Sequence, residues 1–166
     1  PMTRFAAMGR TDHSMRPPTP AATIAYRSPN ACNVCHKDRD AAWANQWVNQ
    51  WYAKDYQVET MHRAALIDAA RKQDWKRLPE MLDALKSKSS DEVYKTSLVR
   101  LLGRCGSPSK QPVLFELLHD ASPLVRSSAV TELGSQLTPE TVPPLVAALG
   151  DESRLVRIRA AMALAK

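Results

Sequence analysis

The chain has 166 residues, of which 44% are hydrophobic and 24% are charged, and its formal net charge is +6. This share of apolar residues excludes a disordered chain, and no apolar run reaches the length of a membrane-spanning helix. Lysine and arginine stand among acidic residues and never form a run of five, so the positive charge does not predict a nucleic-acid partner.

Prolines interrupt the segment between residues 10 and 31, which contains Pro17, Pro18, Pro20 and Pro29. Proline fixes φ and lacks an N–H group, and it restricts the residue before it as well. The composition therefore predicts extended turns without a regular helix, and we expect this segment to wrap around another group.

The most informative motif follows directly, as residues 32–36 read C-N-V-C-H. Two thiols at this spacing can each add across one vinyl group of haem, and the next imidazole is then delivered to the iron. Cys32, Cys35 and His36 are therefore predicted to hold a haem c, with His36 as the proximal ligand.

Two other chemistries remain open for this motif. A zinc site needs a second pair of ligands, and a thioredoxin-like dithiol needs a strand before it and a helix after it. The remaining cysteine, Cys105, lies far along the chain in a helical pattern, and proline-rich sequence precedes Cys32. Neither context favours the alternatives, and Cys105 is expected to be a small buried residue.

His13 is the favoured sixth ligand of the haem iron. It lies in a loop without periodicity, the proline-rich connector is long enough to bring it over the opposite face, and Asp12 could orient its imidazole. His62 falls on a predicted apolar helix face, where a packed histidine is more common. The alternatives to His13 are His62, one of Met8, Met15 and Met61, or an open or externally supplied ligand.

A helical period begins after Asp38, where Trp43, Trp47 and Trp51 recur every four residues. The spacing predicts one aromatic stripe on a helix, and ordinary helix core is its favoured interpretation. The other interpretations are packing beside the haem and a seam between the haem module and the solenoid. A further amphipathic helix is predicted over residues 58–72.

The C-terminal half of the sequence repeats itself at an offset of 31 residues. The matching pairs are Pro112 and Pro143, Leu114 and Leu145, Leu118 and Leu149, Asp120 and Asp151, Leu124 and Leu155, Val125 and Val156, Arg126 and Arg157, Ala129 and Ala160, and Leu133 and Leu164. A weaker copy lies 32 residues upstream, with Leu82, Leu85, Val93 and Leu101 matching Leu114, Leu117, Val125 and Leu133. Helix pairs of this length bury their apolar faces only by stacking into a solenoid.

This pattern, P-x-L-x-x-x-L-x-D-x-x-x-L-V-R-x-x-A, resembles HEAT-like repeats of the phycobilisome-lyase type over residues 78–166. Within it, Asp120 and Asp151 are expected to cap the second helix of each pair. Arg126 and Arg157 are expected to bridge neighbouring turns, so these charges form an internal ladder rather than a site.

A second resemblance covers residues 12–43, which read D-H-S-M-R-P-P-T-P and then S-P-N-A-C-N-V-C-H-K-D-R-D-A-A-W. They are similar to the last haem segment of multihaem c-type cytochromes with C-terminal HEAT or tetratricopeptide repeats. The resemblance implies axial ligation by His36 and a role for His13, either on this haem or on the next one upstream. Only one C-x-x-C-H motif is present, which departs from the pattern of that family. Because the sequence opens on Pro1 without an initiator methionine and stops at Lys166 inside a helical pattern, we interpret the chain as a fragment of a longer protein.

The predicted fold is all-α, with a loop-rich haem module over residues 1–56 and a HEAT-like solenoid, incomplete at its end, over residues 57–166. We expect an electron-transfer protein rather than an enzyme, with redox proteins and further haem domains of the parent chain as partners. Covalent haem attachment predicts a periplasmic or other extracytoplasmic location. The alternatives are a multihaem oxidoreductase acting on a small nitrogen or sulfur compound, and a HEAT scaffold with a zinc or dithiol site.

Overall fold

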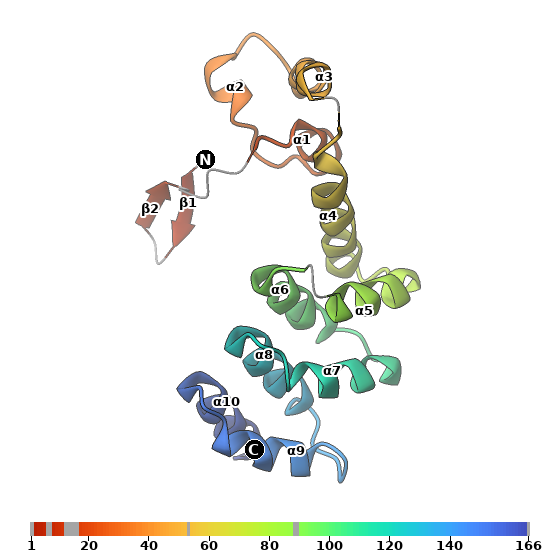
Figure 1. Cartoon of the computed structure of the whole chain (residues 1–166), viewed down its shortest axis with the longest axis vertical. Helices are drawn as coiled ribbons and strands as arrows, with labels where there is room; N and C mark the ends of the chain where they lie inside the picture. The colour runs from red at the N-terminus through yellow and green to blue at the C-terminus, as the bar shows by residue number, and fades with distance from the viewer. Residues whose placement is uncertain (1, 6–7, 12–16, 53, 88–89, 166) are drawn as a thin grey trace. The chain divides into compact units, whose positions relative to one another are not determined.

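The structure is a computed structural model that describes residues 2–5, 8–11, 17–52, 54–87 and 90–165. It divides into two compact units, unit 1 over residues 1–65 and unit 2 over residues 66–166 (Figure 1). Among the described helices, none combines the length and the apolar character that crossing a bilayer requires. The boundary predicted between residues 56 and 57 stays a prediction.

A short antiparallel hairpin opens unit 1. Strand β1 (Met2–Phe5) pairs with β2 (Met8–Thr11), so that Met2 lies opposite Thr11 and Phe5 opposite Met8. The all-α prediction did not include this hairpin, because these residues lack the alternation of apolar and polar positions that marks a strand. The rest of the described chain is helical, and the predicted α-solenoid is confirmed.

The proline-rich segment contains helix α1 (Pro20–Tyr26), although no regular helix was predicted there. Pro20 occupies the first turn, where a backbone N–H would have no helical partner, so proline starts this helix instead of breaking it. The helix ends at Arg27, which adopts a left-handed conformation with φ of 56°.

Helix α3 (Ala41–Trp51) packs against α1 in unit 1. Asp40 caps α3 by accepting a hydrogen bond from the backbone N–H of Trp43 at 2.8 Å. The buried residues of the two helices are small, namely Pro20, Ala22, Ala44 and Val48. Helix α4 (Gln57–Arg71) follows, and the division between the units falls within it.

Gln57 joins three segments of unit 1 and is almost completely buried. Its Oε1 accepts a hydrogen bond from the backbone N–H of Ala21 at 3.1 Å. Its Nε2 donates to Oδ1 of Asn45 at 3.0 Å and of Asn49 at 3.3 Å. Buried polar groups are stable only when they are paired, so this side chain fixes α1 and α3 at the start of α4.

Replacing Gln57 by methionine is expected to destabilise unit 1 by about 2 kcal/mol, because the Ala21 N–H would lose its buried acceptor. Urea unfolding followed by tryptophan fluorescence checks this, since Trp43, Trp47 and Trp51 lie in unit 1. The matched control is Gln46→Met, which changes an exposed glutamine of α3. Equal destabilisation by the two substitutions would contradict the role assigned to Gln57.

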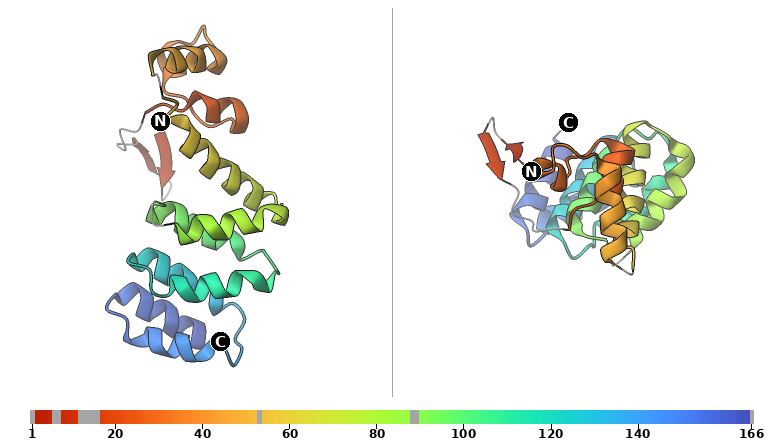
Figure 2. Two further views of the ribbon diagram at one scale, coloured as in Figure 1. Left: turned by 45° about the vertical axis from the view of Figure 1, so that its right-hand side comes forward. Right: turned by 90° about the horizontal axis from the view of Figure 1, so that it is seen from above.

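Unit 2 is a stack of three helix pairs after the end of α4. The pairs are α5 (Leu78–Lys86) with α6 (Glu92–Leu102), α7 (Gln111–Leu117) with α8 (Pro123–Leu133), and α9 (Val142–Ala147) with α10 (Arg154–Leu164). Short 3₁₀ turns precede α5 and α7 and follow α9, at Trp75–Arg77, Pro108–Lys110 and Ala148–Gly150. As Figure 2 shows, the first helices form one layer and the second helices the other.

The core of unit 2 lies between these two layers and is made of aliphatic side chains. Its most completely buried members include Leu66, Met81, Leu85, Leu98, Leu102, Val125, Val130 and Leu145. Cys105 is also buried there, as predicted.

The offset between the first two pairs differs from the prediction. For the first helices the predicted 32 residues hold, since Met81 and Leu85 of α5 take the buried places of Val113 and Leu117 in α7. For the second helices the offset is 31, because buried Tyr94 matches Val125 while Val93 is 63% exposed. The equivalent buried positions Leu85 and Tyr94 are therefore one residue further apart in the sequence than Leu117 and Val125 are.

Helices α8 and α10 approach closely at Gly134. A Cβ atom at this position would lie 2.3 Å from Cβ of Ala163 and 3.3 Å from its Cα. Neither atom can rotate away, so the absence of a side chain at Gly134 permits this packing distance.

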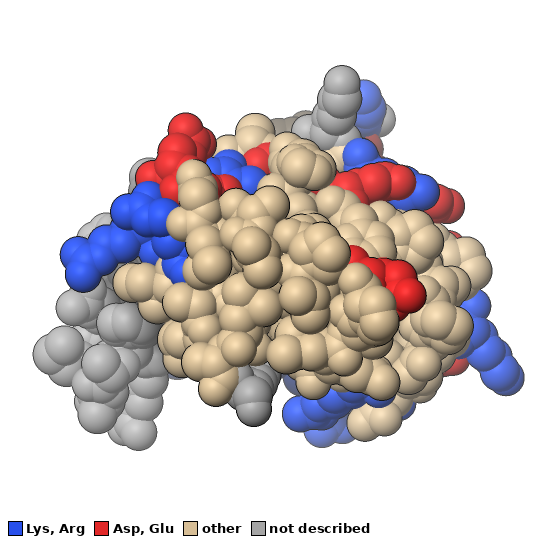
Figure 3. Space-filling view, turned by 90° about the horizontal axis from the view of Figure 1, so that it is seen from below, with Lys and Arg blue, Asp and Glu red and all other residues tan. Residues whose placement is uncertain are grey.

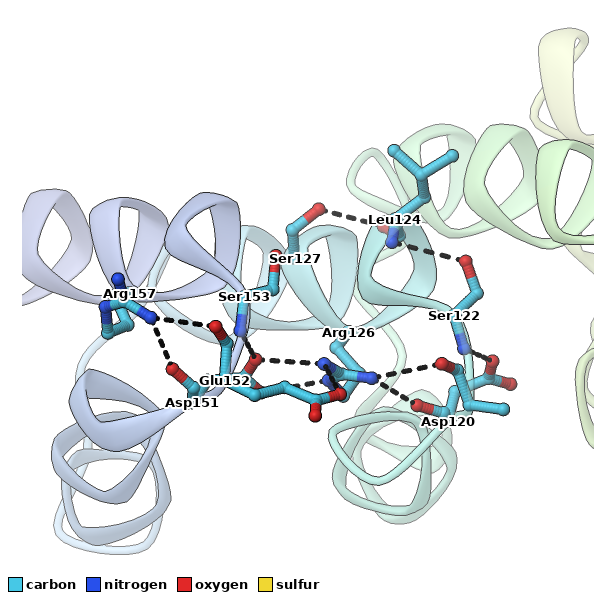
Figure 4. A network of polar contacts seen from close by, with 10 residues as sticks. Asp120, Ser122, Leu124, Arg126, Ser127, Asp151, Glu152, Ser153 and Arg157 are labelled. Carbon is cyan, nitrogen blue, oxygen red and sulfur yellow. Dashed lines mark hydrogen bonds and ion pairs between the residues drawn. The ribbon is translucent and has the colours of Figure 1, made fainter.

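Charged side chains connect successive pairs as a ladder. Lys95 of the first pair contacts Asp120 of the second at 2.9 Å. Arg126 of the second pair contacts Asp151 of the third at 2.9 Å (Figure 4). The predicted ladder is confirmed, but the predicted caps are wrong. Ser122 is the N-cap of α8, and Asp120 instead accepts from the N–H of Ser122 at 2.9 Å.

Candidate functional site

Helix α2 (Cys32–Cys35) is a single turn that holds the C-N-V-C-H motif. The His36 N–H donates to the carbonyl oxygen of Cys32 at 3.0 Å and closes this turn. Positions three residues apart lie on the same side of a helical turn, so both thiols project from one side of α2.

Two asparagines fasten the motif to its surroundings, and the sequence analysis did not identify either. Asn30 is buried, accepts from the Cys32 N–H at 3.2 Å and donates to Oδ1 of Asn33 at 2.7 Å. Asn33 in turn donates to the carbonyl oxygen of Arg39 at 2.7 Å. Asn30 lies two residues before Cys32, and Asn33 follows Cys32 directly. This placement of two asparagines around the first cysteine is the sequence signal for these hydrogen bonds.

The thiols of the motif are free and accessible. Cys32 is half-buried and Cys35 is exposed, and neither forms a disulfide. Both are therefore available for a covalent bond to an added group, in contrast to the buried Cys105 of unit 2.

A pocket of about 230 Å³ opens beside the motif. Its walls come from α2, from the residues next to it and from one face of α3, and they comprise Ala31, Cys32, Cys35, His36, Trp43, Ala44, Trp47 and Trp51. The His36 ring lies against Trp43, with centroids 4.8 Å apart and planes inclined by 50°. The pocket thus combines two thiols, one imidazole and a largely aromatic wall.

The tryptophan stripe is not ordinary helix core, so its favoured interpretation is wrong. Trp43 and Trp47 are half-buried and Trp51 is 67% exposed, whereas the buried residues of α3 are Ala44 and Val48. The aromatic face is rotated away from the packed face of the helix and borders the pocket instead.

Tyr56 connects the proline-rich segment to this part of unit 1. Its hydroxyl donates a hydrogen bond to the carbonyl oxygen of Pro18, and its ring meets Tyr52 edge to face at 5.0 Å. Burial raises the pKa of Tyr56, and the neighbouring Tyr52 and Cys32 raise it further. The phenol therefore stays protonated and keeps its donor role at neutral pH.

Of the candidate sixth ligands of the haem iron, some lie outside the described residues and others lie on α4. His13, Asp12 and Met15 lie outside the described residues, as does the side chain of Met8. His62 is exposed on α4, so the prediction of a packed histidine is wrong. Across the described ranges, no group of three His, Cys, Asp or Glu residues is placed to hold a metal ion.

Unit 2 defines the class of the protein, because three stacked helix pairs with one repeated contact between neighbours form an α-solenoid. The sequence pattern of the HEAT repeats matches residues 78–165, which is more than half of the chain. The chain belongs to the HEAT-repeat family. Comparison with curated proteins finds no match.

Proposed function

We propose that Cys32 and Cys35 bind a haem c covalently, that His36 is an axial ligand of its iron, and that the protein transfers electrons. The observation that carries this proposal is the shared pocket, because both thiols and the imidazole border one cavity with a tryptophan wall. A flat apolar group with two reactive vinyl substituents matches the chemistry of these side chains, which are two thiols, an imidazole and three indoles.

The residues present fit a haem better than the alternatives left open by the sequence. Zinc in a structural site needs four ligands that converge on one point, and a dithiol enzyme needs a strand leading into its motif. A bend and the four residues 27–30 without regular structure precede α2. Haem requires only what α2 offers, namely two accessible thiols and the adjacent imidazole.

Each residue of the site has a separate task. Cys32 and Cys35 anchor the group, and His36 supplies a nitrogen ligand whose ring orientation is limited by its contact with Trp43. Trp47 and Trp51 cover apolar surface and keep water from it. When bound, the haem supplies one-electron chemistry, with a potential set by its ligands and by the polarity of this pocket.

His13 is the proposed second axial ligand, of this haem or of a neighbouring one. A bis-histidine iron has no open position, which favours electron transfer over catalysis. We also propose a periplasmic or other extracytoplasmic location, because covalent attachment of haem to a C-x-x-C-H motif is completed there.

The HEAT repeats of unit 2 supply the second part of the proposed function. Repeats of this kind present extended surfaces that commonly bind other proteins. We propose that unit 2 docks redox partner proteins or further haem domains, while unit 1 holds the haem.

The protein matured in a host that attaches c-type haem is expected to weigh one haem more than its amino acids. It should also show a Soret band and stain for haem after denaturing electrophoresis. The double variant Cys32→Ala and Cys35→Ala should lose all three signals. Cys105→Ala is the matched control, since it removes the third cysteine and should leave the haem attached.

A matured polypeptide of unmodified mass without a Soret band would refute the haem and leave a HEAT scaffold. If haem is present, His13→Ala tests the second ligand, and a change from a low-spin to a high-spin spectrum is expected. Binding of carbon monoxide by the unmodified protein would instead indicate an open iron position and favour the oxidoreductase.

A further inference from the structure

We propose that Asn33, at the first variable position of the C-x-x-C-H motif, is a positioning residue for His36 as an axial ligand of the haem iron. It acts through the turn of the chain that follows His36, and not by contact with the haem. The inference rests on the haem binding proposed above, and it assigns unequal roles to the two variable residues of the motif, Asn33 and Val34.

The side chain of Asn33 forms hydrogen bonds to residues before and after α2. Its Oδ1 accepts from Nδ2 of the buried Asn30 at 2.7 Å, and Oδ1 of Asn30 accepts from the backbone N–H of Cys32 at 3.2 Å. Its Nδ2 donates to the carbonyl oxygens of Arg39 and His36, at 2.7 and 3.4 Å. A carboxamide supplies an acceptor and two donors on one short side chain, which neither a hydroxyl nor a carboxylate does. These partners therefore require a carboxamide at position 33.

The bonds of Asn33 fix the path of the chain from His36 to α3. The backbone N–H of Arg39 donates to the carbonyl oxygen of His36 at 3.2 Å and closes a turn, and Asn33 donates to the carbonyl oxygen at each end of this turn. Asp40 comes next and caps α3 by accepting from the Trp43 N–H at 2.8 Å. The turn therefore sets where α3 begins, and the start of α3 places Trp43.

Trp43 transmits this constraint to the imidazole. Its ring lies against the ring of His36, with the centroids 4.8 Å apart. His36 is exposed, and within the described part of the chain no hydrogen bond to its ring nitrogens is found. Groups that surround an axial histidine orient its ring and thereby tune the metal. The contact with Trp43 therefore limits the angle of the imidazole ring, and Asn33 maintains that contact.

Val34 provides a comparison within the same motif. Its side chain is 64% exposed, whereas Asn33 is half-buried. A substitution at Val34 is expected to leave the turn after His36 and its hydrogen bonds in place. The two variable positions can therefore be changed separately, with Cys32, Cys35 and His36 kept.

Proton NMR of the full-length ferric protein with attached haem, saturated with cyanide, tests the orientation of His36. Cyanide occupies the sixth position in every variant, so the result does not depend on which residue holds that position otherwise. Because cyanide is linear and has no preferred direction in the haem plane, the four haem methyl resonances report the angle of the His36 ring. Asn33→Ala is expected to shift these resonances several times further than Val34→Ala.

Asn33→Asp and Val34→Asp form a second matched pair. Asn33→Asp keeps the size of the side chain and the oxygen that accepts from Asn30, but it removes both donors to the turn. Val34→Asp adds the same charge at the exposed position next to it. Asn33→Asp is expected to shift the methyl resonances as Asn33→Ala does, and this pair keeps the test decisive if the alanine variant does not mature.

Val146→Asp controls for the change in net charge, which is the same in all three aspartate variants. Val146 is 52% exposed on α9 of unit 2. Figure 3 shows mainly uncharged atoms over the end of unit 2 that includes α9, with charged residues mostly at its rim. This variant is expected to leave the haem methyl resonances unchanged. A shift as large as that of Asn33→Asp would show that net charge, and not the turn after His36, moves the resonances.

Unshifted resonances in both Asn33 variants, or equal shifts in the Val34 variants, would overturn the positioning role and leave the haem binding intact. Loss of haem from the two Asn33 variants alone would also overturn it, because Asn33 would then act on haem attachment. Haem absent from the unmodified protein, as judged by its mass, would refute the proposed function and this inference together.

Discussion

Replacing Arg126 by methionine is expected to lower the free energy of unfolding of unit 2 by about 3 kcal/mol or more, because one partner of a buried ion pair is removed. Asp151 would keep the backbone N–H of Ser153 as a donor but lose both guanidinium contacts. Methionine would still fill the space that the aliphatic part of the Arg126 side chain occupies. Urea unfolding followed by circular dichroism at 222 nm measures the loss.

Arg157→Met is the matched control for this experiment. It removes the same side chain and the same kind of contacts to backbone carbonyl groups, but from an exposed position. Its expected cost is below about 1 kcal/mol, as for other exposed charges. If both substitutions cost the same, the contact between Arg126 and Asp151 contributes nothing measurable.

Acid provides a second measurement on the same pair. The hydrogen bonds from Arg126 lower the pKa of Asp151 below its ordinary value of 3.8. A lowered pKa in the folded state stabilises the protein above the unfolded-state value, and this contribution is lost as the pH falls through the folded-state value. The difference between wild type and Arg126→Met should therefore shrink once the pH falls below 3.8, and an unchanged difference would contradict the pairing.

Gly134→Ala is expected to destabilise unit 2 by about 3 kcal/mol, because the added methyl group would lie 2.3 Å from Cβ of Ala163. Since the obstacle includes the Cα atom of Ala163, relief requires α8 and α10 to move apart. Thermal unfolding followed by circular dichroism gives the size of the effect.

Gly106→Ala is the control, since nothing lies within 4 Å of the position of its Cβ and its φ is not positive. This substitution should be neutral or stabilise the chain by about 0.5 kcal/mol, through the lower entropy of the unfolded state. Destabilisation of similar size at Gly106 and Gly134 would mean that the close approach of two helices is not responsible for the effect at Gly134.

The repeats could be predicted where sequence and packing share one period. The 31-residue offset between the last two helix pairs follows directly from matching leucines and charges. The first pair differs because its equivalent buried positions, Leu85 and Tyr94, lie one residue further apart than Leu117 and Val125 do, and apolar residues at neighbouring positions allow two registers. The predicted register matches Val93 instead of Tyr94, and it therefore does not identify Lys95 as the equivalent of Arg126.

The candidate site could be predicted only where its residues adjoin in the sequence. Cys32, Cys35 and His36 form one motif, whereas the contact of His36 with Trp43 depends on how the chain turns between α2 and α3. The hydrogen bonds of Asn30 and Asn33 depend on the same turn. Periodicity could not distinguish the packed face of α3 from its aromatic face, because small Ala44 and Val48 carry the packing.

The ion pairs of the ladder also bear on how unit 2 loses its structure. Each pair joins two successive repeats, so the unfolding of one repeat leaves a desolvated charge in the next without its counter-charge. Such a penalty couples the stability of neighbours and raises the cost of partly folded states. The solenoid should consequently melt as one cooperative block, and not repeat by repeat.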